Sequence, residues 1–290
     1  MHYEGDIIRP PSEAHSLILQ VTVGCTHNKC TFCPSYKPKS FKMKPFEIVQ
    51  ADLMEARSYS RHVDRVFFAD GDALCMTTDK LMRLLDAVRE VFPECTRVGI
   101  YSRATQILKK SHEELVRLRE AGLGIAYIGA ESGSDTVLQN VIKGETVGDI
   151  TEAVRKAEAA GITTSVTFIL GLGGRELMAE HAEKTGKMIT AMGASYVGLL
   201  TLLVSRAAPI YKDVASGKLE LLSPLETLEE LEIILNNTEC ETETVLRSNH
   251  ASNWLSLKGT LPQDKEKLLD QINRAKSDPN MLRSSRQRRL

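Results

Sequence analysis

The chain has 290 residues, of which 42% are hydrophobic and 26% are charged, a composition typical of a globular protein with a sizeable core. Lys and Arg total 37 against 38 Asp and Glu, so the balanced charge gives no general reason to expect nucleic acid as a partner. No stretch approaches the roughly 20 apolar residues of a membrane span, and the N-terminus lacks the apolar region of a secretory signal. We therefore expect a cytoplasmic protein with no membrane partner, in which grouped cysteines indicate metal binding or catalysis more than disulfides.

Six short apolar runs are predicted to be β-strands, and the segments between most of them have helical periodicity. The runs are residues 16–23, 65–69, 97–101, 125–130, 163–170 and 195–203. Several are apolar on both faces, as parallel strands buried between helices are. Ser111 and Glu114 form a capping-box pattern, and Gly122 and Gly161 stand where helices should end. The alternation predicts an α/β fold with right-handed crossovers and a parallel sheet.

Beyond residue 203 the pattern loosens. Helices are expected at 209–216 and 225–236, a further strand at 242–248, and a last helix near Pro262. Six strand–helix units predict a partial (β/α)6 TIM-like barrel with a C-terminal mixed helical extension, and ligands of such folds bind at the C-terminal strand ends. We expect an N-terminal extension at 1–15, a core at 16–205, and an extension at 206–290 that closes the barrel. The basic tail "LRSSRQRRL" is interpreted as a frayed, solvated end.

Cys25, Cys30 and Cys33 lie within nine residues, in the loop that follows the first strand. Packing explains them poorly because the loop around them is polar. A structural zinc site needs a fourth ligand from elsewhere, for which His15 and His27 are the candidates, and His27 is poorly placed because it lies between the cysteines. A [4Fe–4S] cluster held by three thiolates leaves one iron open, which explains the odd number, and the spacing favours a cluster without excluding zinc. The other cysteines are interpreted as isolated packing residues: Cys75, Cys95 and Cys240.

The cysteine loop, with Phe32 before its last cysteine, resembles that of the radical S-adenosylmethionine superfamily. The resemblance continues in "FFADGDAL" after the second strand, "YIGAESGSDTVLQNVIKGET" around the fourth, and "AGITTSVTFILGLGGRE" around the fifth. The last two segments are similar to the branch that contains the elongator catalytic subunit, the methylthiotransferases and oxygen-independent coproporphyrinogen oxidase. One departure is the spacing between Cys25 and Cys30, which are separated by four residues where three are commonest.

The resemblance implies the partial barrel and an enzyme of oxidoreductase-type radical chemistry. Its cofactors would be a [4Fe–4S] cluster and S-adenosyl-L-methionine, which binds the open iron. Reductive cleavage would give a 5′-deoxyadenosyl radical that abstracts hydrogen from an unidentified substrate. An electron donor such as flavodoxin or ferredoxin is implied, and the balanced charge favours a small molecule or a peptide over nucleic acid as substrate.

The resemblance also implies roles for individual residues. Cys25, Cys30 and Cys33 would bind iron. The residues that would contact S-adenosylmethionine are Phe32, Asp70, Gly71, Asp72, Ser102, Glu131, Lys143, Thr167, Leu170 and Gly171. Lys143 stands where coproporphyrinogen oxidases place an arginine, and Thr167 where some relatives carry an acid.

Two further groups are candidates for contact with the substrate. Tyr101 and Arg103 end the third strand at the predicted barrel mouth. His250 and Trp254 lie in the polar segment 246–259, interpreted either as a simple connecting loop or as a catalytic loop that covers the mouth.

Two alternatives to the radical enzyme remain at this stage. One is a cluster-containing binding protein or haem carrier related to coproporphyrinogen oxidase, which the unusual cysteine spacing favours slightly. The other is a structural zinc protein.

Overall fold

The computed structural model describes residues 1–288, which form two compact units. Unit 1 contains residues 1–28, 35–128 and 156–164. Unit 2 contains residues 29–34 and 129–155 and continues from Ser165 to the end of the described chain. These units are defined by which residues pack together and not by chain segments. The predicted segment boundaries at residues 15 and 205 therefore stay predictions. Among the described residues, no helix is long and apolar enough to cross a membrane.

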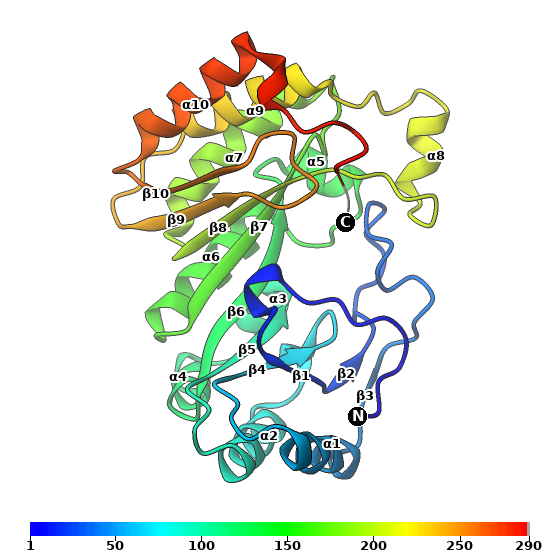
Figure 1. The fold of residues 1–290 in the computed structure, drawn as a ribbon, viewed down its shortest axis with the longest axis vertical. Helices are drawn as coiled ribbons and strands as arrows, with labels where there is room; N and C mark the ends of the chain where they lie inside the picture. Colours follow the sequence, from blue (N-terminus) through cyan, green and yellow to red (C-terminus); the bar gives the residue numbers. More distant parts are fainter. Residues whose placement is uncertain (289–290) are drawn as a thin grey trace. The chain divides into compact units, whose positions relative to one another are not determined.

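Unit 1 is built on parallel strands in the order β1-β4-β5-β6 (Figure 1). These are β1 (Leu17–Gln20), β4 (Arg65–Ala69), β5 (Arg97–Ser102) and β6 (Leu123–Glu131), whose last three residues belong to unit 2. A small antiparallel pair joins β2 (Thr22–Val23) and β3 (Lys42–Met43). The helices are α1 (Phe46–Tyr59), α2 (Thr78–Val91), α3 (Ala104–Leu108) and α4 (His112–Glu120), with 3-10 turns η1 (Pro11–Glu13) and η2 (Ala73–Cys75).

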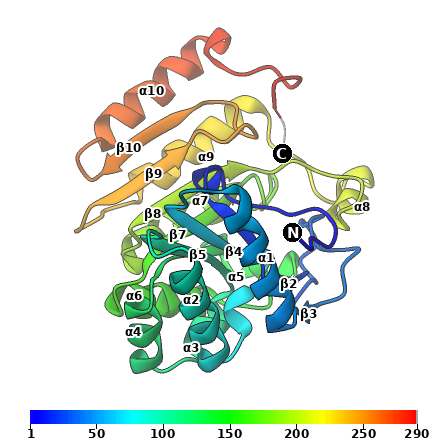
Figure 2. The ribbon, with the colours of Figure 1, turned by 60° about the horizontal axis from the view of Figure 1, so that its bottom comes forward.

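Unit 2 continues the α/β pattern with strands in the order β7-β8-β9-β10. These are β7 (Thr163–Leu170), whose first two residues belong to unit 1, β8 (Tyr196–Thr201), β9 (Thr244–Ser248) and β10 (Leu257–Leu261), of which the last is antiparallel to β9. The helices are α5 (Asp135–Asn140), α6 (Val147–Ala159), whose last four residues belong to unit 1, α7 (Met178–Met192), α8 (Ile210–Ala215), α9 (Pro224–Asn236) and α10 (Lys265–Ser277), and η3 (Pro279–Met281) follows. The helices α7, α9 and α10 lie beside one another (Figures 1 and 2).

The predicted α/β fold is confirmed, and local signals placed its elements. The six predicted strands correspond to β1 with β2, β4, β5, β6, β7 and β8. Ser111 and Glu114 form the predicted capping box of α4. Gly122 and Gly161 follow α4 and α6 with left-handed φ angles of 112° and 77°, which glycine adopts without steric cost. The short elements that were not predicted are β3, α3, α5, β10 and the 3-10 turns η1, η2 and η3.

The prediction of a frayed C-terminal tail is wrong for its described part. Arg283 N–H donates to the carbonyl of Trp254 at 2.8 Å, and the Arg288 guanidinium lies 3.8 Å from the Trp254 ring centre. A cation above an indole ring is a favourable contact, so the tail is held by unit 2. The final residues of the predicted tail, 289–290, lie outside the described residues.

The close packing of α7 on α9 depends on Gly186. A Cβ atom at this position would lie 2.5 Å from the carbonyl oxygen of Ile234 and 2.7 Å from Cβ of Asn237. Both neighbours belong to α9 or to its C-cap, and a backbone carbonyl cannot move aside as a flexible side chain can. A glycine is therefore required at this contact.

We predict that Gly186→Ala destabilises the protein by about 2 kcal/mol, because overpacking against a backbone costs about 1–3 kcal/mol and exceeds the gain in helix propensity. Urea unfolding checks this value. Gly148→Ala in α6 is the matched control, because its Cβ would meet only Thr146 Oγ1 at 3.7 Å. The control should be neutral or slightly stabilising, and equal effects of the two changes would contradict the packing argument.

Candidate active site

The segment Lys29–Pro34, which carries two of the grouped cysteines, is anchored within unit 2 by its backbone. Thr31 N–H donates to the carbonyl of Val141 at 2.9 Å, at the C-terminal end of α5. Ile210 N–H, at the start of α8, donates to the carbonyl of Thr31 at 2.9 Å. The middle of this cysteine-bearing segment is thus fixed by two helix ends.

Phe32 anchors the same segment through its side chain. It packs against an apolar cluster of buried residues, namely Val137, Val141, Leu172, Ala208 and Ile210. The flanking thiols of Cys30 and Cys33 remain half-buried, and neither belongs to a disulfide. Phe32 therefore has a packing role in unit 2, and its predicted contact with adenine stays a prediction.

A buried cation lies beside the end of β6. Lys143 Nζ is 3.2 Å from a carboxylate oxygen of Glu131 and 3.7 Å from one of Glu145. Burial alone would lower the pKa of Lys143, but the charges of Glu131 and Glu145, with a smaller contribution from Cys30, raise that pKa above its ordinary value. Lys143 is therefore charged, and a positive charge near Cys30 favours the thiolate form that binds metals.

The backbone of Glu131 is strained to present its carboxylate. Glu131 has a φ of 69°, and a Cβ on Gly129, two residues earlier, would lie 2.1 Å from its Oε1 atom. Burial raises the pKa of Glu131, and the charge of Lys143 opposes this effect. Strained residues of this kind often occur at functional sites.

A Schellman motif at the end of α5 positions Lys143. Lys143 N–H donates to the carbonyl of Leu138 at 2.9 Å, and Ile142 N–H donates to that of Gln139 at 3.0 Å. Ile142 has the left-handed φ of 54° that the motif requires at this position. Glycine is the usual residue there, and nothing in the structure explains why a β-branched side chain replaces it.

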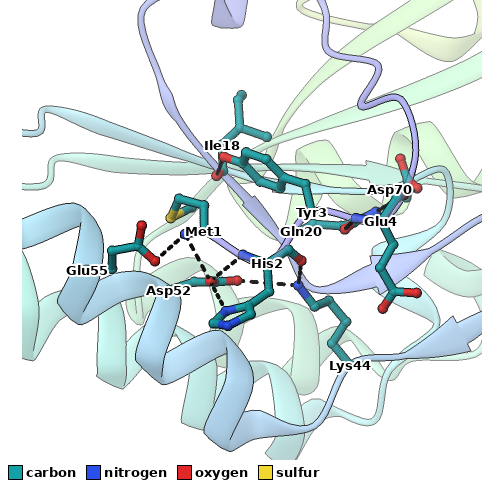
Figure 3. A network of polar contacts seen from close by, with 10 residues as sticks. All are labelled: Met1, His2, Tyr3, Glu4, Ile18, Gln20, Lys44, Asp52, Glu55 and Asp70. Carbon is teal, nitrogen blue, oxygen red and sulfur yellow. Dashed lines mark hydrogen bonds and ion pairs between the residues drawn. The ribbon is translucent and has the colours of Figure 1, made fainter.

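In unit 1, the "DGD" motif holds the first part of the cysteine loop. Asp70 Oδ2 accepts from Gly24 N–H at 3.1 Å, Lys39 Nζ at 2.8 Å and Gln20 Nε2 at 3.3 Å, and Gln20 and Asp70 are drawn in Figure 3. The other oxygen, Asp70 Oδ1, is buried and receives no hydrogen bond from the described residues. Asp70 therefore retains an acceptor for which residues 1–288 supply no donor.

Asp72, by contrast, is hydrogen-bonded through both oxygens. It accepts from Arg103 N–H at 3.2 Å, Gln106 Nε2 at 3.1 Å and the hydroxyl of Thr26. Burial raises the pKa of Asp72 although these donors oppose the effect. Because Gly24 and Thr26 flank Cys25, the two carboxylates fix the loop on both sides of this thiol.

Asn28 lies in the four-residue stretch between Cys25 and Cys30. Asn28 has a φ of 45°, a left-handed conformation that asparagine tolerates better than most residues. Its Nδ2 donates to the carbonyl of Tyr36 at 2.7 Å. Burial raises the pKa of Cys25, while backbone hydrogen bonds from Asn28 and His27 oppose it.

Gly71 is covered by an aromatic ring. A Cβ on Gly71 would lie 2.5 Å from the ring of Tyr36, and Lys39 Nζ lies 5.6 Å from the centre of that ring. The glycine thus allows Tyr36 to pack directly on the backbone of the motif. This is the backbone that we expected to approach S-adenosylmethionine, and that expectation stays a prediction.

The residues at the C-terminal end of β5 have two different environments, an aromatic cluster and the "DGD" motif. Tyr101 packs edge-to-face against Phe67 at 4.9 Å and against Tyr127 at 6.1 Å between ring centres. Burial raises the pKa of Tyr101. Ser102 Oγ donates to the carbonyl of Arg103 at 2.8 Å, and Arg103 N–H reaches Asp72. Ser102 and Arg103 therefore lie beside the "DGD" motif, whereas Tyr101 belongs to an apolar cluster.

At the end of β7, Gly171 turns the chain with a left-handed φ of 76°. Its N–H donates to Glu230 Oε2, on α9, at 2.7 Å. Leu170 is buried and Thr167 is half-buried on β7. Glu230 is 59 residues distant in sequence, and no local pattern indicated its partner.

The segment between β9 and β10 is a structured loop. Asn253 is buried, accepts from Thr201 Oγ1 at 2.9 Å, and donates to the carbonyl of Leu199 at 2.7 Å. Ser252 Oγ accepts from Thr201 N–H at 3.2 Å. These contacts fasten the loop to the C-terminal end of β8.

The candidate substrate residues of this loop are held by the tail. His250 Nδ1 is 2.9 Å from Ser252 Oγ, and the carbonyl of His250 accepts from Arg283 at 2.7 Å. Burial, with the charge of Arg283, lowers the pKa of His250 below its ordinary value. Trp254 is half-buried beneath Arg288. The structure brings His250 and Trp254 into one loop, and their action on a substrate stays a prediction.

Several residues beside these motifs were missed because their partners are distant in sequence. Tyr36 and Lys39 follow the cysteine loop without a recognisable pattern, and Glu230 lies in an ordinary helix. Glu145 was detectable, because it follows Lys143 by two residues within a recognised segment.

A second acidic group lies near the N-terminus of unit 1 and is shown in Figure 3. His2, Asp52 and Glu55 bring metal-ligating atoms within 4.8 Å of one another. The protein supplies cations of its own, because Lys44 Nζ lies 3.3 Å from Asp52 and the amino group of Met1 pairs with Glu55. The group therefore ties Met1 and His2 to α1 and carries no metal assignment.

The comparisons with known proteins define the family. The sequence matches the radical SAM superfamily over residues 19–185, more than half of the chain, so the protein belongs to this superfamily. This establishes a radical SAM enzyme by class, whose family implies a [4Fe–4S] cluster, S-adenosylmethionine and a reductant.

The curated relatives are distant and longer. A 4′-phospho-dehydrooxetanocin synthase of Priestia megaterium is 26% identical over 174 residues, covering 53% of this chain and 23% of the relative. A putative methylthiotransferase of Methanocaldococcus jannaschii is 24% identical over 174 residues, covering 57% of this chain and 37% of the relative. The matched part is thus less than two-fifths of either relative.

Solved structures confirm the predicted partial-barrel fold. Methylornithine synthase (PylB) has a TM-score of 0.56 at 14% identity, covering 89% of this chain and 68% of that one. The N-terminally truncated archaeal Elp3 of Methanocaldococcus infernus has a TM-score of 0.54 at 14% identity, covering 92% and 64%. At these identities the likeness shows the fold alone.

We predict that Asp52→Asn costs about 3 kcal/mol at neutral pH, because it leaves the buried Lys44 ammonium without its carboxylate. Burial opposes ionisation of Asp52, but hydrogen bonds from His2 and the charge of Lys44 lower its pKa. The ionised group therefore stabilises the fold above its ordinary pKa of about 4, and this stability is lost as the pH falls through the lowered value.

Urea unfolding at neutral and acidic pH measures this effect. The difference between wild type and Asp52→Asn should shrink in acid. Asp64→Asn is the control, because Asp64 forms an exposed pair with His62 and should change stability by less than about 1 kcal/mol. An Asp52 effect independent of pH would contradict the assignment.

Proposed function

We propose that this protein uses a [4Fe–4S] cluster and S-adenosylmethionine to abstract hydrogen from a small molecule or peptide. One observation carries the proposal: three half-buried cysteines, none of them in a disulfide, follow β2 in one loop, in a chain that belongs to the radical SAM superfamily. The alternatives, a haem carrier or a zinc protein, are outcomes of the test below.

The donor set fits a cluster. Cys25, Cys30 and Cys33 would ligate three irons, because thiolates are the usual cluster ligands. Two of these thiols lie on the anchored segment Lys29–Pro34, and Lys143 adds positive charge near Cys30. A ligand loop that is held before the metal binds requires little reorganisation.

The polar groups at the strand ends fit S-adenosylmethionine. Asp70 Oδ1 is a buried acceptor without a donor among the described residues, which suits an ammonium group. Glu131 offers a carboxylate and Lys143 a cation at the end of β6. The other proposed contacts are Phe32, Gly71, Asp72, Ser102, Thr167, Leu170 and Gly171.

When bound, the cluster and S-adenosylmethionine would supply a 5′-deoxyadenosyl radical. This chain's residues would bind the two cofactors, orient the substrate and exclude water. The loop of His250 and Trp254 covers the C-terminal end of β8, Tyr101 lies near the end of β5, and Arg103 directly follows that strand. We infer a reducing compartment such as the cytoplasm, and an electron donor such as flavodoxin or ferredoxin.

We predict that anaerobic reconstitution gives about four irons and four sulfides per chain, and that dithionite with S-adenosylmethionine then gives 5′-deoxyadenosine. Cys25→Ser, Cys30→Ser and Cys33→Ser should each lose the cluster, whereas the half-buried Cys95→Ser and Cys240→Ser should keep it. Iron and sulfide analysis, with chromatography of the nucleoside, provides the measurement. Bound zinc without sulfide, or haem binding without 5′-deoxyadenosine, would sink the proposal.

We predict that Trp254→Ala and His250→Ala leave iron content and S-adenosylmethionine affinity within about twofold of wild type. Trp254→Ala should shorten the lifetime of the cluster in air at least about twofold, because the loop that shields the strand ends loses its stacking with Arg288. Bleaching of the cluster's visible absorption measures this lifetime. Tyr196→Ala, at the opposite end of β8, is the aromatic control. If both loop variants lose the cluster on reconstitution, the loop is structural.

A further inference from the structure

Four polar groups of unit 2 meet beneath the ends of β6 and β7. Ser132 directly follows β6, Gly171 directly follows β7, His181 lies on α7, and Glu230 lies on α9. The side chains of Ser132, His181 and Glu230 belong to residues that are 0% exposed. These three side chains are closed to solvent, so their role lies within the protein.

Their geometry forms a chain between the two strand ends. Gly171 N–H donates to Glu230 Oε2 at 2.7 Å, and Ser132 Oγ lies 2.7 Å from His181 Nδ1. The link between the two halves is His181 Nε2 and Glu230 Oε1, which lie 3.8 Å apart. Both of these atoms are buried, and neither has a hydrogen-bond partner among the described residues.

Two facing orphan atoms indicate a shared proton. A buried polar atom without a partner costs free energy, and a small rotation of either side chain would close the gap to a hydrogen bond. Burial raises the pKa of Glu230 to about 8, although the Gly171 N–H opposes it, and burial lowers the pKa of His181 to about 4, although a backbone hydrogen bond with Ile169 opposes it. These shifts favour uncharged groups near neutral pH, and the carboxyl O–H can then donate to Nε2 in the tautomer whose proton is on Nδ1.

We propose that Glu230 and His181 are a positioning pair that fixes the turn at Gly171 to the strand end at Ser132 and thereby sets the affinity for S-adenosylmethionine. This rests on the proposed function, because the residues that immediately precede these two ends, Glu131 and Leu170, are proposed cofactor contacts. Unlike a catalytic Ser–His–acid triad, the group has no exposed nucleophile.

Each substitution at Glu230 or His181 keeps or removes a different part of these interactions. Glu230→Gln keeps an acceptor for Gly171 N–H and an amide donor for His181 Nε2, so it should behave like wild type. Glu230→Met keeps the volume and loses both interactions. His181→Asn keeps a polar group and removes the reach towards Glu230, and it serves as a second probe if Glu230→Met does not fold.

We expect Glu230→Met to weaken S-adenosylmethionine binding to the reconstituted protein about tenfold, the effect of one unsatisfied buried donor, and Glu230→Gln to stay within about twofold. Iron content should be unchanged in both. Glu13→Met and Glu13→Gln are matched controls, because Glu13 is equally buried but bonds to Arg97 and Tyr127. The controls should lower stability and leave the dissociation constant unchanged.

Hydrogen exchange of the cluster-free protein gives a readout that does not need the cofactor. In Glu230→Met and His181→Asn, exchange of the Gly171 amide and of amides 132–134 should accelerate about tenfold relative to Glu13→Met, and Glu230→Gln should restore protection. If exchange is unchanged, the pair does not hold the strand ends and the proposal is wrong. If exchange accelerates but wild type binds no S-adenosylmethionine, the positioning role stands, whereas the proposed function and the claimed effect on affinity fail.

Discussion

The electrostatics of unit 2 depend on the ion pairs that the buried ammonium group of Lys143 forms with Glu131 and Glu145. This ammonium group lies among two carboxylates and the thiol of Cys30, groups that could not share a dry environment without a cation. Holding it requires left-handed backbone at Ile142 and Glu131 and a glycine at 129. The strained backbone at Glu131 and Ile142 thus serves to hold the charge of Lys143 in place.

In unit 1 the carboxylates of the "DGD" motif are also buried, and hydrogen-bond donors stabilise them together with one ammonium group, that of Lys39. Asp70 and Asp72 are stabilised largely by N–H and O–H donors, two of which, Gly24 N–H and the Thr26 hydroxyl, come from the cysteine loop itself. Consequently, the carboxylates order the residues around Cys25, whereas in unit 2 helix ends and apolar packing order the residues around Cys30 and Cys33. Two different kinds of interaction fix the two parts of one short loop.

The sequence allowed prediction of features whose causes are local. The capping box at Ser111, the helix stops at Gly122 and Gly161, and the alternation of apolar runs each depend on a few neighbouring residues. The cysteine loop was recognised for the same reason. The partner of Gly171, the ring over Gly71 and the tail against Trp254 could not be predicted, because each joins segments through packing that no local pattern encodes.

The contact between Arg288 and Trp254 has a spectroscopic consequence. The chain contains a single tryptophan, so its indole emission comes from one ring, and that ring lies 3.8 Å from a guanidinium group of the C-terminal tail. The native protein therefore contains its own fluorescent probe at the end of β8. The wavelength and intensity of that emission depend on whether Arg288 of the tail contacts the Trp254 ring, so no added label is needed to observe this contact.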